Sequence, residues 1–157
     1  DITNRDAMSQ LFTSIFEKWG TIDFWVHTAI HAPPLSPLIT LDLGDFDKTI
    51  STNITATALL INFISPIISK EGNALFFDDP CNGKKFFGAY GSSKIAQMSL
   101  VQSWANECIN FGPNITVFKP APMKTALRAR FFPGENKENL LSPKSEAKRV
   151  LATLFNP

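Results

Sequence analysis

The sequence predicts an α/β fold in which three short parallel strands alternate with helices. Two observations support this prediction. Several long segments carry apolar residues at helical spacing, whereas three short runs are β-branched and aromatic, as in buried strands. Clusters of Gly, Pro and Asn separate these segments. Central parallel strands need neighbours on both edges, so three strands also predict an incomplete domain.

The first helix is expected to begin near Thr3 and to end at Gly20. Thr3-Asn4-Arg5-Asp6 resembles a capping box with Asp in place of the usual Glu, and glycine is a suitable C-cap. Between them, apolar residues follow helical spacing: Met8, Leu11, Phe12, Ile15, Phe16 and Trp19. The aromatic and β-branched run 22–28 then predicts a buried strand.

The middle of the chain predicts a long helix, a strand and a second long helix. Residues 45 to about 70 have helical character, with a bend or a tighter turn near Pro66. Residues 71–73 (Glu-Gly-Asn) are typical of a turn, and 74–77 of a buried strand. A polar loop leads to the next helix, at 88–111.

The last third predicts one more strand and a terminal helix. Gly112-Pro113-Asn114 ends the preceding helix, and 115–118 is β-branched and apolar. A loop then covers 119–141, with one helical turn expected near 127–132. Ser142 and Pro143 are suited to the N-cap and first position of a helix that continues to about Phe155.

Composition excludes several classes of function. The formal charge of +1 gives no electrostatic case for nucleic acid or an anionic membrane. The longest apolar run, 58–68, is too short and too interrupted to span a bilayer. Two cysteines make no disulfide framework, and no Cys/His cluster has metal-ligand spacing, so we expect no metal site. A reducing cytoplasm is the simplest location.

Tyr90 and Lys94 form the most informative pair of residues. They lie at i and i+4 of the predicted helix and therefore on one face. A nearby ammonium favours the phenolate, lowers the pKa of the tyrosine and makes it usable as a general acid/base. The same spacing also occurs by chance on solvated helix faces, so the pair needs support from the rest of the chain.

That support is the order of landmarks around the pair, which resembles the short-chain dehydrogenase/reductase family. Residues 1–3 (Asp-Ile-Thr) are similar to the Asp-Val-Thr after the family's third strand, and 27–30 (His-Thr-Ala-Ile) fall where the family has Asn-Asn-Ala-Gly. Asn53, Tyr90 and Lys94 take the places of catalytic residues. Lys119-Pro120-Ala121 stands at the family's Pro-Gly. The resemblance implies that 1–157 is a truncated, partial Rossmann-like domain with a doubly wound parallel sheet, lacking the Gly-rich nucleotide-binding half.

The resemblance also implies a cofactor and roles for single residues. NAD or NADP would exchange a hydride with a small carbonyl or alcohol, while Tyr90 transfers the proton. The fragment alone is expected to be inactive, with the nucleotide-binding half supplied elsewhere. Lys94 would hold the phenolate and the nicotinamide ribose, and Asn53 would fix a relay water. The expected cofactor-binding residues are Asp1 at the adenine, Thr125 at the carboxamide, Lys94 at the ribose, and Thr28, Ala29 and Pro120. A homo-oligomer would form through the helices of Asn53 and Tyr90.

Three substitutions depart from the family pattern. Asp79 lies where the family has a catalytic serine. An ionised carboxylate only accepts hydrogen bonds, and it raises the pKa of a neighbouring phenol, although a protonated Asp79 could donate. The simpler expectation is that Asp78 and Asp79 belong to a solvated acidic loop. Ile30 and Ala121 replace glycines that allow close approach of the cofactor. The alternative hypothesis is therefore a degenerate, non-catalytic family member that acts as an association module.

Two further interpretations stay open. His27 is expected to be a strand histidine more than a catalytic base, because no Ser or Cys elbow accompanies it. Arg128 and Arg130 could face an anionic substrate or simply solvent.

Overall fold

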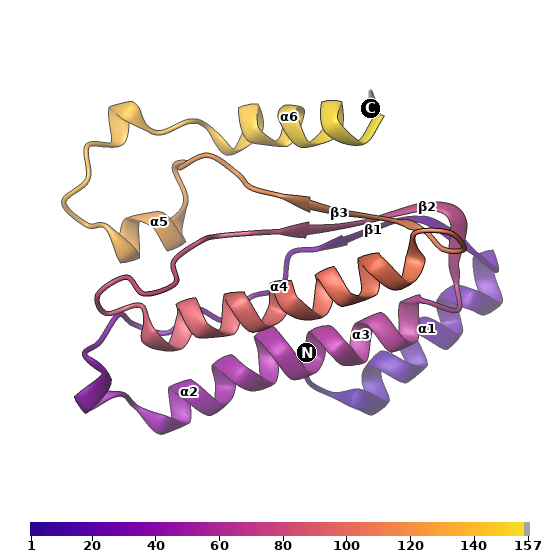
Figure 1. Ribbon diagram of the computed structural model, residues 1–157, viewed down its shortest axis with the longest axis horizontal. Helices are drawn as coiled ribbons and strands as arrows, with labels where there is room; N and C mark the ends of the chain where they lie inside the picture. Colours follow the sequence, from indigo (N-terminus) through magenta and orange to yellow (C-terminus); the bar gives the residue numbers. More distant parts are fainter. Residues whose placement is uncertain (156–157) are drawn as a thin grey trace.

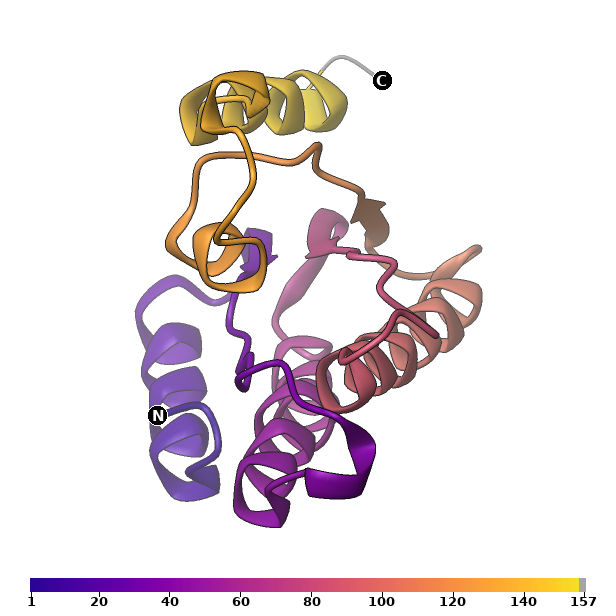
Figure 2. The same ribbon diagram turned by 90° about the vertical axis from the view of Figure 1, so that its left-hand side faces the viewer.

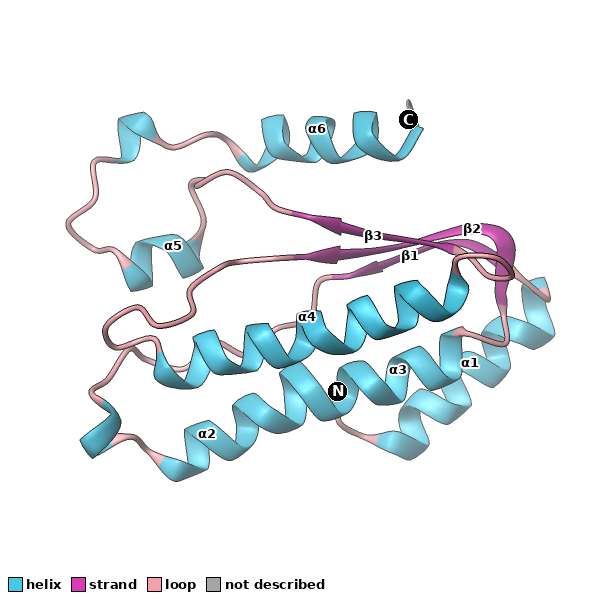
Figure 3. Cartoon of the chain, viewed as in Figure 1, coloured by secondary structure: helices cyan, strands magenta, loops and turns pink. Residues whose placement is uncertain are grey.

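Three parallel strands and the helices that cover them make up the computed structural model, which describes residues 1–155 (Figures 1 and 3). The strands are β1 (Ile22–His27), β2 (Ile68–Phe77) and β3 (Asn114–Phe118), in the order β1-β2-β3. His27 pairs with Phe76, and Phe77 pairs with Phe118. All three carboxyl ends therefore reach the same edge of the sheet, and the predicted α/β class is confirmed.

Helices lie on both faces of this sheet (Figure 2). On one face are α1 (Arg5–Trp19), α3 (Ala56–Ile64) and α4 (Gly88–Cys108), and on the other is α6 (Pro143–Phe155). Side chains of a strand alternate between the faces. Trp25 accordingly packs against the core under α3 and α4, whereas Phe24 is 41% exposed and touches Phe155 of α6, with ring centroids 5.0 Å apart.

The main core lies between the sheet and the three-helix face. Its buried members come from α1, α3, β2 and α4 and the turn between α3 and β2: Met8, Phe12, Leu60, Ile64, Ile67, Ile68, Ala74, Phe76, Val101 and Trp104. Phe76 is fully buried and makes edge contacts with Trp25 and Trp104, with centroids 5.1 Å and 6.3 Å away. Such edge-to-face pairs add to the free energy of burial.

The long middle helix is interrupted and shorter than predicted. It consists of α2 (Leu43–Ile50), a π-helical turn (Ser51–Thr55) and α3, and it ends at Ile64 instead of near residue 70. The segment predicted as a turn, 71–73, lies inside β2. Gly72 lies where the register between β1 and β2 is irregular, and a Cβ there would lie 3.0 Å from the backbone oxygen of Asp23 in β1. The glycine is needed for close strand approach.

Smaller differences concern the helix ends. The N-cap of α1 is Asn4, which accepts from the amide of Ala7 at 3.0 Å, so the predicted capping box was one residue out. Gly20 is the C-cap as predicted, with a φ of 72°. α4 ends at Cys108, three residues before the expected Phe111. α5 (Ala126–Phe131) and the Ser142 cap of α6 confirm the predictions for the last third.

None of the helices found within residues 1–155 is both long enough and apolar enough to cross a bilayer. Within the same residues, no cluster of three or more His, Cys, Asp or Glu side chains could hold a metal ion.

Candidate active site

The candidate site lies at the carboxyl edge of the sheet, on the left of Figure 1, where the loops after β1 and β2 meet the start of α4. Gly91 allows this approach. A Cβ at residue 91 would lie 2.9 Å from the backbone oxygen of Cys81, closer than ordinary side chains come. The first turn of α4 therefore rests directly on the loop that carries Asp79 and Cys81.

Tyr90 donates its phenol proton to Asp79. The distance from the phenol oxygen to Oδ2 is 3.1 Å, and the thiol of Cys81 donates to Oδ1 at 3.1 Å. Tyr90 is buried and packs against Phe87 and Phe131, with ring centroids 6.5 Å and 5.1 Å away. The structure thus brings Tyr90 and Asp79 together at the serine position, with Asp79 half-buried instead of in the expected solvated loop.

These surroundings raise the pKa of the Tyr90 phenol well above its ordinary value. Burial is the larger cause, and the charge and hydrogen bond of Asp79 follow. Burial and Asp79 also raise the pKa of the Cys81 thiol to about 12. The expectation that Lys94 lowers the pKa of Tyr90 is therefore wrong for this arrangement, and the expected opposing effect of Asp79 is confirmed.

Lys94 lies on the same face of α4 as Tyr90, but its ammonium turns toward the sheet. Nζ donates to the backbone oxygen of Phe77 at 2.6 Å and to Oε1 of Gln97 at 2.6 Å. The pKa of Lys94 is lowered, because the effect of burial outweighs the charges of Asp78, Asp79 and Cys81, which act to raise it. An ammonium has three donors, and two are used by these acceptors.

Asn53 joins the π-helical turn to the loop after β1. Its Nδ2 donates to the backbone oxygen of His31 at 2.8 Å and to Oγ of Ser93 at 2.9 Å, and its Oδ1 accepts from the amide of His31 at 2.7 Å. The side chain is completely buried. Asn53 is therefore close to α4, as the resemblance implied, and its relay role stays a prediction.

The expected cofactor-binding residues are spread along the edge. Thr28 and Ala29 follow β1 directly, and Pro120 follows β3. Thr125 caps α5 by accepting from the amide of Arg128 at 3.1 Å. Asp1 lies in the turn before α1, where its carboxylate accepts from the backbone and hydroxyl of Thr3.

The two substituted glycine positions have structural roles here. Ile30 packs against the apolar cluster around Phe87 and Tyr90. Ala121 donates its amide to Oε2 of Glu146 at 2.9 Å, and Glu146 is 3% exposed. The sequence did not single out Glu146. Its only signal was a place in the first turn of the final helix, where a carboxylate is favourable.

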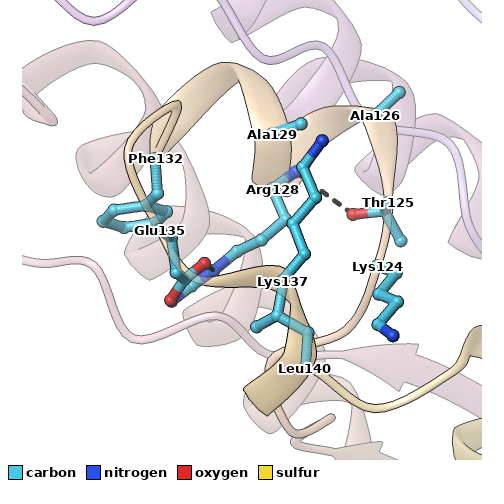
Figure 4. Close-up of a pocket in the computed structure, with 9 residues that line it drawn as sticks. All are labelled: Lys124, Thr125, Ala126, Arg128, Ala129, Phe132, Glu135, Lys137 and Leu140. Atoms are coloured by element: carbon cyan, nitrogen blue, oxygen red, sulfur yellow. Dashed lines mark hydrogen bonds and ion pairs between the residues drawn. The ribbon is translucent and has the colours of Figure 1, made fainter.

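A cavity of about 260 Å³ opens beside Thr125 (Figure 4). Its walls come from the end of the loop after β3, from α5 and from the segment after it: Lys124, Thr125, Ala126, Arg128, Ala129, Phe132, Glu135, Lys137 and Leu140. Arg128 donates to both oxygens of Glu135, at 2.7 Å and 2.5 Å, and its guanidinium lies over the ring of Phe132. Arg128 is thus already paired, whereas Arg130 donates to the backbone oxygen of Ala32.

Two buried polar residues behind Lys94, Gln97 and Thr57, were not predicted from the sequence. Gln97 is three residues after Lys94 and seven after Tyr90, so helical spacing puts all three on one face. A polar residue at such a buried position is a signal that could have been found. The apolar residue of this stretch, Ile95, is 52% exposed and therefore lies off the buried face.

Comparison with known proteins shows to which family the chain belongs. The family model described as Enoyl-(Acyl carrier protein) reductase matches residues 1–153. The chain belongs to the short-chain dehydrogenase/reductase family. A sorbitol dehydrogenase of Cereibacter sphaeroides is 22% identical over 158 residues, which cover 95% of this chain and 59% of that protein.

Solved structures of the family share the fold at similarly low identity. A short-chain dehydrogenase of Salmonella enterica serovar Typhi superposes with a TM-score of 0.92 at 23% identity, covering 99% of this chain and 67% of that one. An alcohol dehydrogenase of Thermococcus sibiricus, complexed with 5-hydroxy-NADP, superposes with a TM-score of 0.80 at 20% identity and the same 67% coverage of that chain. The chain spans about three fifths to two thirds of the length of these relatives.

Proposed function

We propose that this chain forms the substrate and nicotinamide end of an NAD(P)-dependent oxidoreductase that acts on a small carbonyl or alcohol. The observation that carries the proposal is the buried Lys94 ammonium at the carboxyl end of β2, on the same helix face as the buried phenol of Tyr90. Ligands of open α/β sheets bind outside the carboxyl ends of the strands. The short-chain dehydrogenase/reductase ancestry supports the same reaction class.

The residues present fit the nicotinamide end of such a cofactor. One N–H of Lys94 is left after its two hydrogen bonds and is available for the ribose. The hydroxyl of Thr125 accepts from Arg128 and keeps its own proton for a carboxamide oxygen. When bound, the nicotinamide supplies or takes the hydride. In the proposal Tyr90 exchanges the proton at its phenol oxygen, Asn53 supports the relay, and Asp1, Thr28, Ala29 and Pro120 complete the cofactor site.

The hydrogen bond between Tyr90 and Asp79 favours a second candidate function, a non-catalytic family member. A phenol whose pKa is raised, and whose proton is held by a carboxylate, is a poor acid/base near neutral pH. In that case the fold would persist as an association module. A cytoplasmic location is common to both proposals and agrees with the free thiols of Cys81 and Cys108.

Binding of a nicotinamide nucleotide is the direct test of the first function. We expect reduced nicotinamide mononucleotide and NADPH to shift the NMR signals of Lys94 and Thr125 in the full chain. Lys94→Met should weaken this binding about tenfold or more, because a hydrogen bond to a charged group is lost. Lys70→Met, which removes an exposed lysine of β2, is the matched control and should leave the affinity unchanged. Absence of any shift with either nucleotide would overturn the first function.

A further inference from the structure

A continuous chain of buried polar side chains runs behind Lys94, from β1 through α3 to α4. Its members are His27, Thr57, Gln97 and Lys94, which are 5%, 0%, 2% and 6% exposed. Buried polar groups are costly unless they are hydrogen-bonded, and each of these has at least one partner. These four side chains link β1 to the carboxyl end of β2 without passing through Tyr90.

The hydroxyl of Thr57 determines which group donates and which accepts in each hydrogen bond between these side chains. It has one proton, which it donates to the backbone oxygen of Asn53 at 2.8 Å. Its oxygen can therefore only accept from its other neighbours. Nε2 of Gln97 lies 3.0 Å away, and Nε2 of His27 lies 3.3 Å away. Both must carry protons, so His27 is the tautomer with hydrogen on Nε2.

The same reasoning about donors and acceptors determines the orientation of the side-chain amide of Gln97. Because its NH₂ group must face Thr57, its Oε1 faces Lys94, at 2.6 Å from Nζ. The reverse orientation would point NH₂ donors at an ammonium and leave the Thr57 oxygen opposite a carbonyl. Both ends of the amide thus favour one orientation.

Several charged and titratable groups surround the ammonium that Gln97 holds. Asp78, Asp79 and Cys81 face it from the loop after β2, and His27 lies close enough in β1 for Lys94 to lower its pKa. Burial disfavours the charged form of Lys94. Within residues 1–155, the backbone oxygen of Phe77 and Oε1 of Gln97 are the hydrogen-bond acceptors of this ammonium.

We propose that Gln97 is a positioning residue, which holds the Lys94 ammonium against the carboxyl end of β2 while Thr57 and His27 fix its own orientation. This role deepens the proposed function and rests on it, because Lys94 has a task only if the site takes a nicotinamide nucleotide. Gln97 keeps Lys94 charged and leaves one N–H directed away from the amide. It touches neither the phenol of Tyr90 nor, in the proposal, the substrate.

The test measures the pKa of Lys94 by NMR in the full chain with ¹³C-labelled lysine, and the Lys94→Arg variant assigns the signal. Gln97→Leu should lower the proton-binding constant of Lys94 about tenfold or more, because the ammonium loses one of two acceptors and stays buried. Gln97→Glu should restore or raise it, since a carboxylate supplies the acceptor. Gln102→Leu removes an exposed glutamine of the same helix and should change nothing.

Two further variants keep the test decisive if Gln97→Leu does not fold. Thr57→Val frees the amide of Gln97 and should shift the pKa of Lys94 in the same direction by a smaller amount. Gln97→Met gives a second, flexible apolar replacement if Gln97→Leu does not fold. An unchanged pKa of Lys94 in the folded Gln97→Leu or Gln97→Met protein would overturn the proposal. Failure to bind any nicotinamide nucleotide would instead overturn the proposed function, and it would leave the Lys94 titration as predicted.

Discussion

Tyr90 is the one tyrosine of the chain, so its ionisation can be followed directly in the near-ultraviolet absorbance of tyrosinate. In the native protein we expect no tyrosinate near the ordinary pKa of about 10, because burial and Asp79 raise the pKa of Tyr90. Asp79→Ser should increase the acid dissociation constant of the phenol about tenfold or more. The pKa should stay above about 10, since burial remains.

Two variants separate the causes of that shift. Asp79→Asn keeps an acceptor for Tyr90 and removes the charge, so its titration should fall between those of the native and Asp79→Ser proteins. Asp78→Ser is the matched control, because Asp78 contributes least of the causes. If Tyr90 titrates identically in the native and Asp79→Ser proteins, while tryptophan fluorescence reports a folded chain, Asp79 does not control the phenol.

Single residues also mark where sequence reasoning succeeds and where it stops. The direction of the effect of Asp79 on Tyr90 was predictable, because a negative charge beside a phenol raises its pKa. The contact itself was not the favoured expectation, since a solvated acidic loop was expected there. The direction of the Lys94 side chain was not predictable. Spacing puts Lys94 and Tyr90 on one face of α4. Spacing does not show that the ammonium donates to the backbone oxygen of Phe77 in β2 and to Oε1 of Gln97 instead of pointing to the phenol.

At the scale of elements, the π-helical turn depends on Asn53 to join the middle helix to the loop after β1. Asn53→Ala removes three hydrogen bonds and leaves the amide and carbonyl of His31 without that partner. We expect the free energy of unfolding, measured with urea, to fall by about 3 kcal/mol.

The matched control for that change is Asn62→Ala, an exposed asparagine of α3. It should alter the free energy of unfolding by no more than about 0.5 kcal/mol. Equal losses for the two variants would show that Asn53 contributes nothing beyond an ordinary helix position.

The elements themselves were predictable from the sequence where local signals agree with the sheet. Apolar spacing located α1 and α4, and the β-branched runs located β1 and β3. The start of β2 at Ile68 was missed because 71–73 has the composition of a turn. Asn73 pairs with Phe24 of β1 and with Asn114 of β3, whereas Glu71 and Gly72 lie in the irregular stretch between the Ile22–Ile68 and Phe24–Asn73 pairs. The strand thus accommodates turn-like residues where its pairing is irregular.

For the whole molecule, the structure predicts loss of stability in mild acid. Burial, followed by the charge of Lys94, lowers the pKa of His27 from 6.5 to about 4. Below pH 6.5 the unfolded chain therefore binds a proton that the folded chain does not, so stability falls as the pH decreases from about 6.5 to about 4. This shift corresponds to a loss on the order of 3 kcal/mol across that window.

Urea unfolding across this pH range measures the effect. His27→Leu should flatten the curve, because the variant lacks the titrating imidazole. His31 adds a contribution of the same sign, since burial lowers its pKa as well. A native protein whose slope in this range equals that of His27→Leu would contradict the prediction. The homo-oligomer expected through the helices of Asn53 and Tyr90 remains a prediction at this scale.

The outer edge of β1 has a consequence for handling the chain in solution. Within residues 1–155, β1 hydrogen-bonds to β2 only, and its other edge presents unpaired backbone groups. Proteins usually blunt such edges with lysine, proline or a bulge that turns them away. For this purpose β1 has Asp23 and the irregular register between Ile22 and Phe24, beside the exposed Phe24 and Val26. At high concentration, this edge is where precipitation through strand-to-strand pairing between copies would begin.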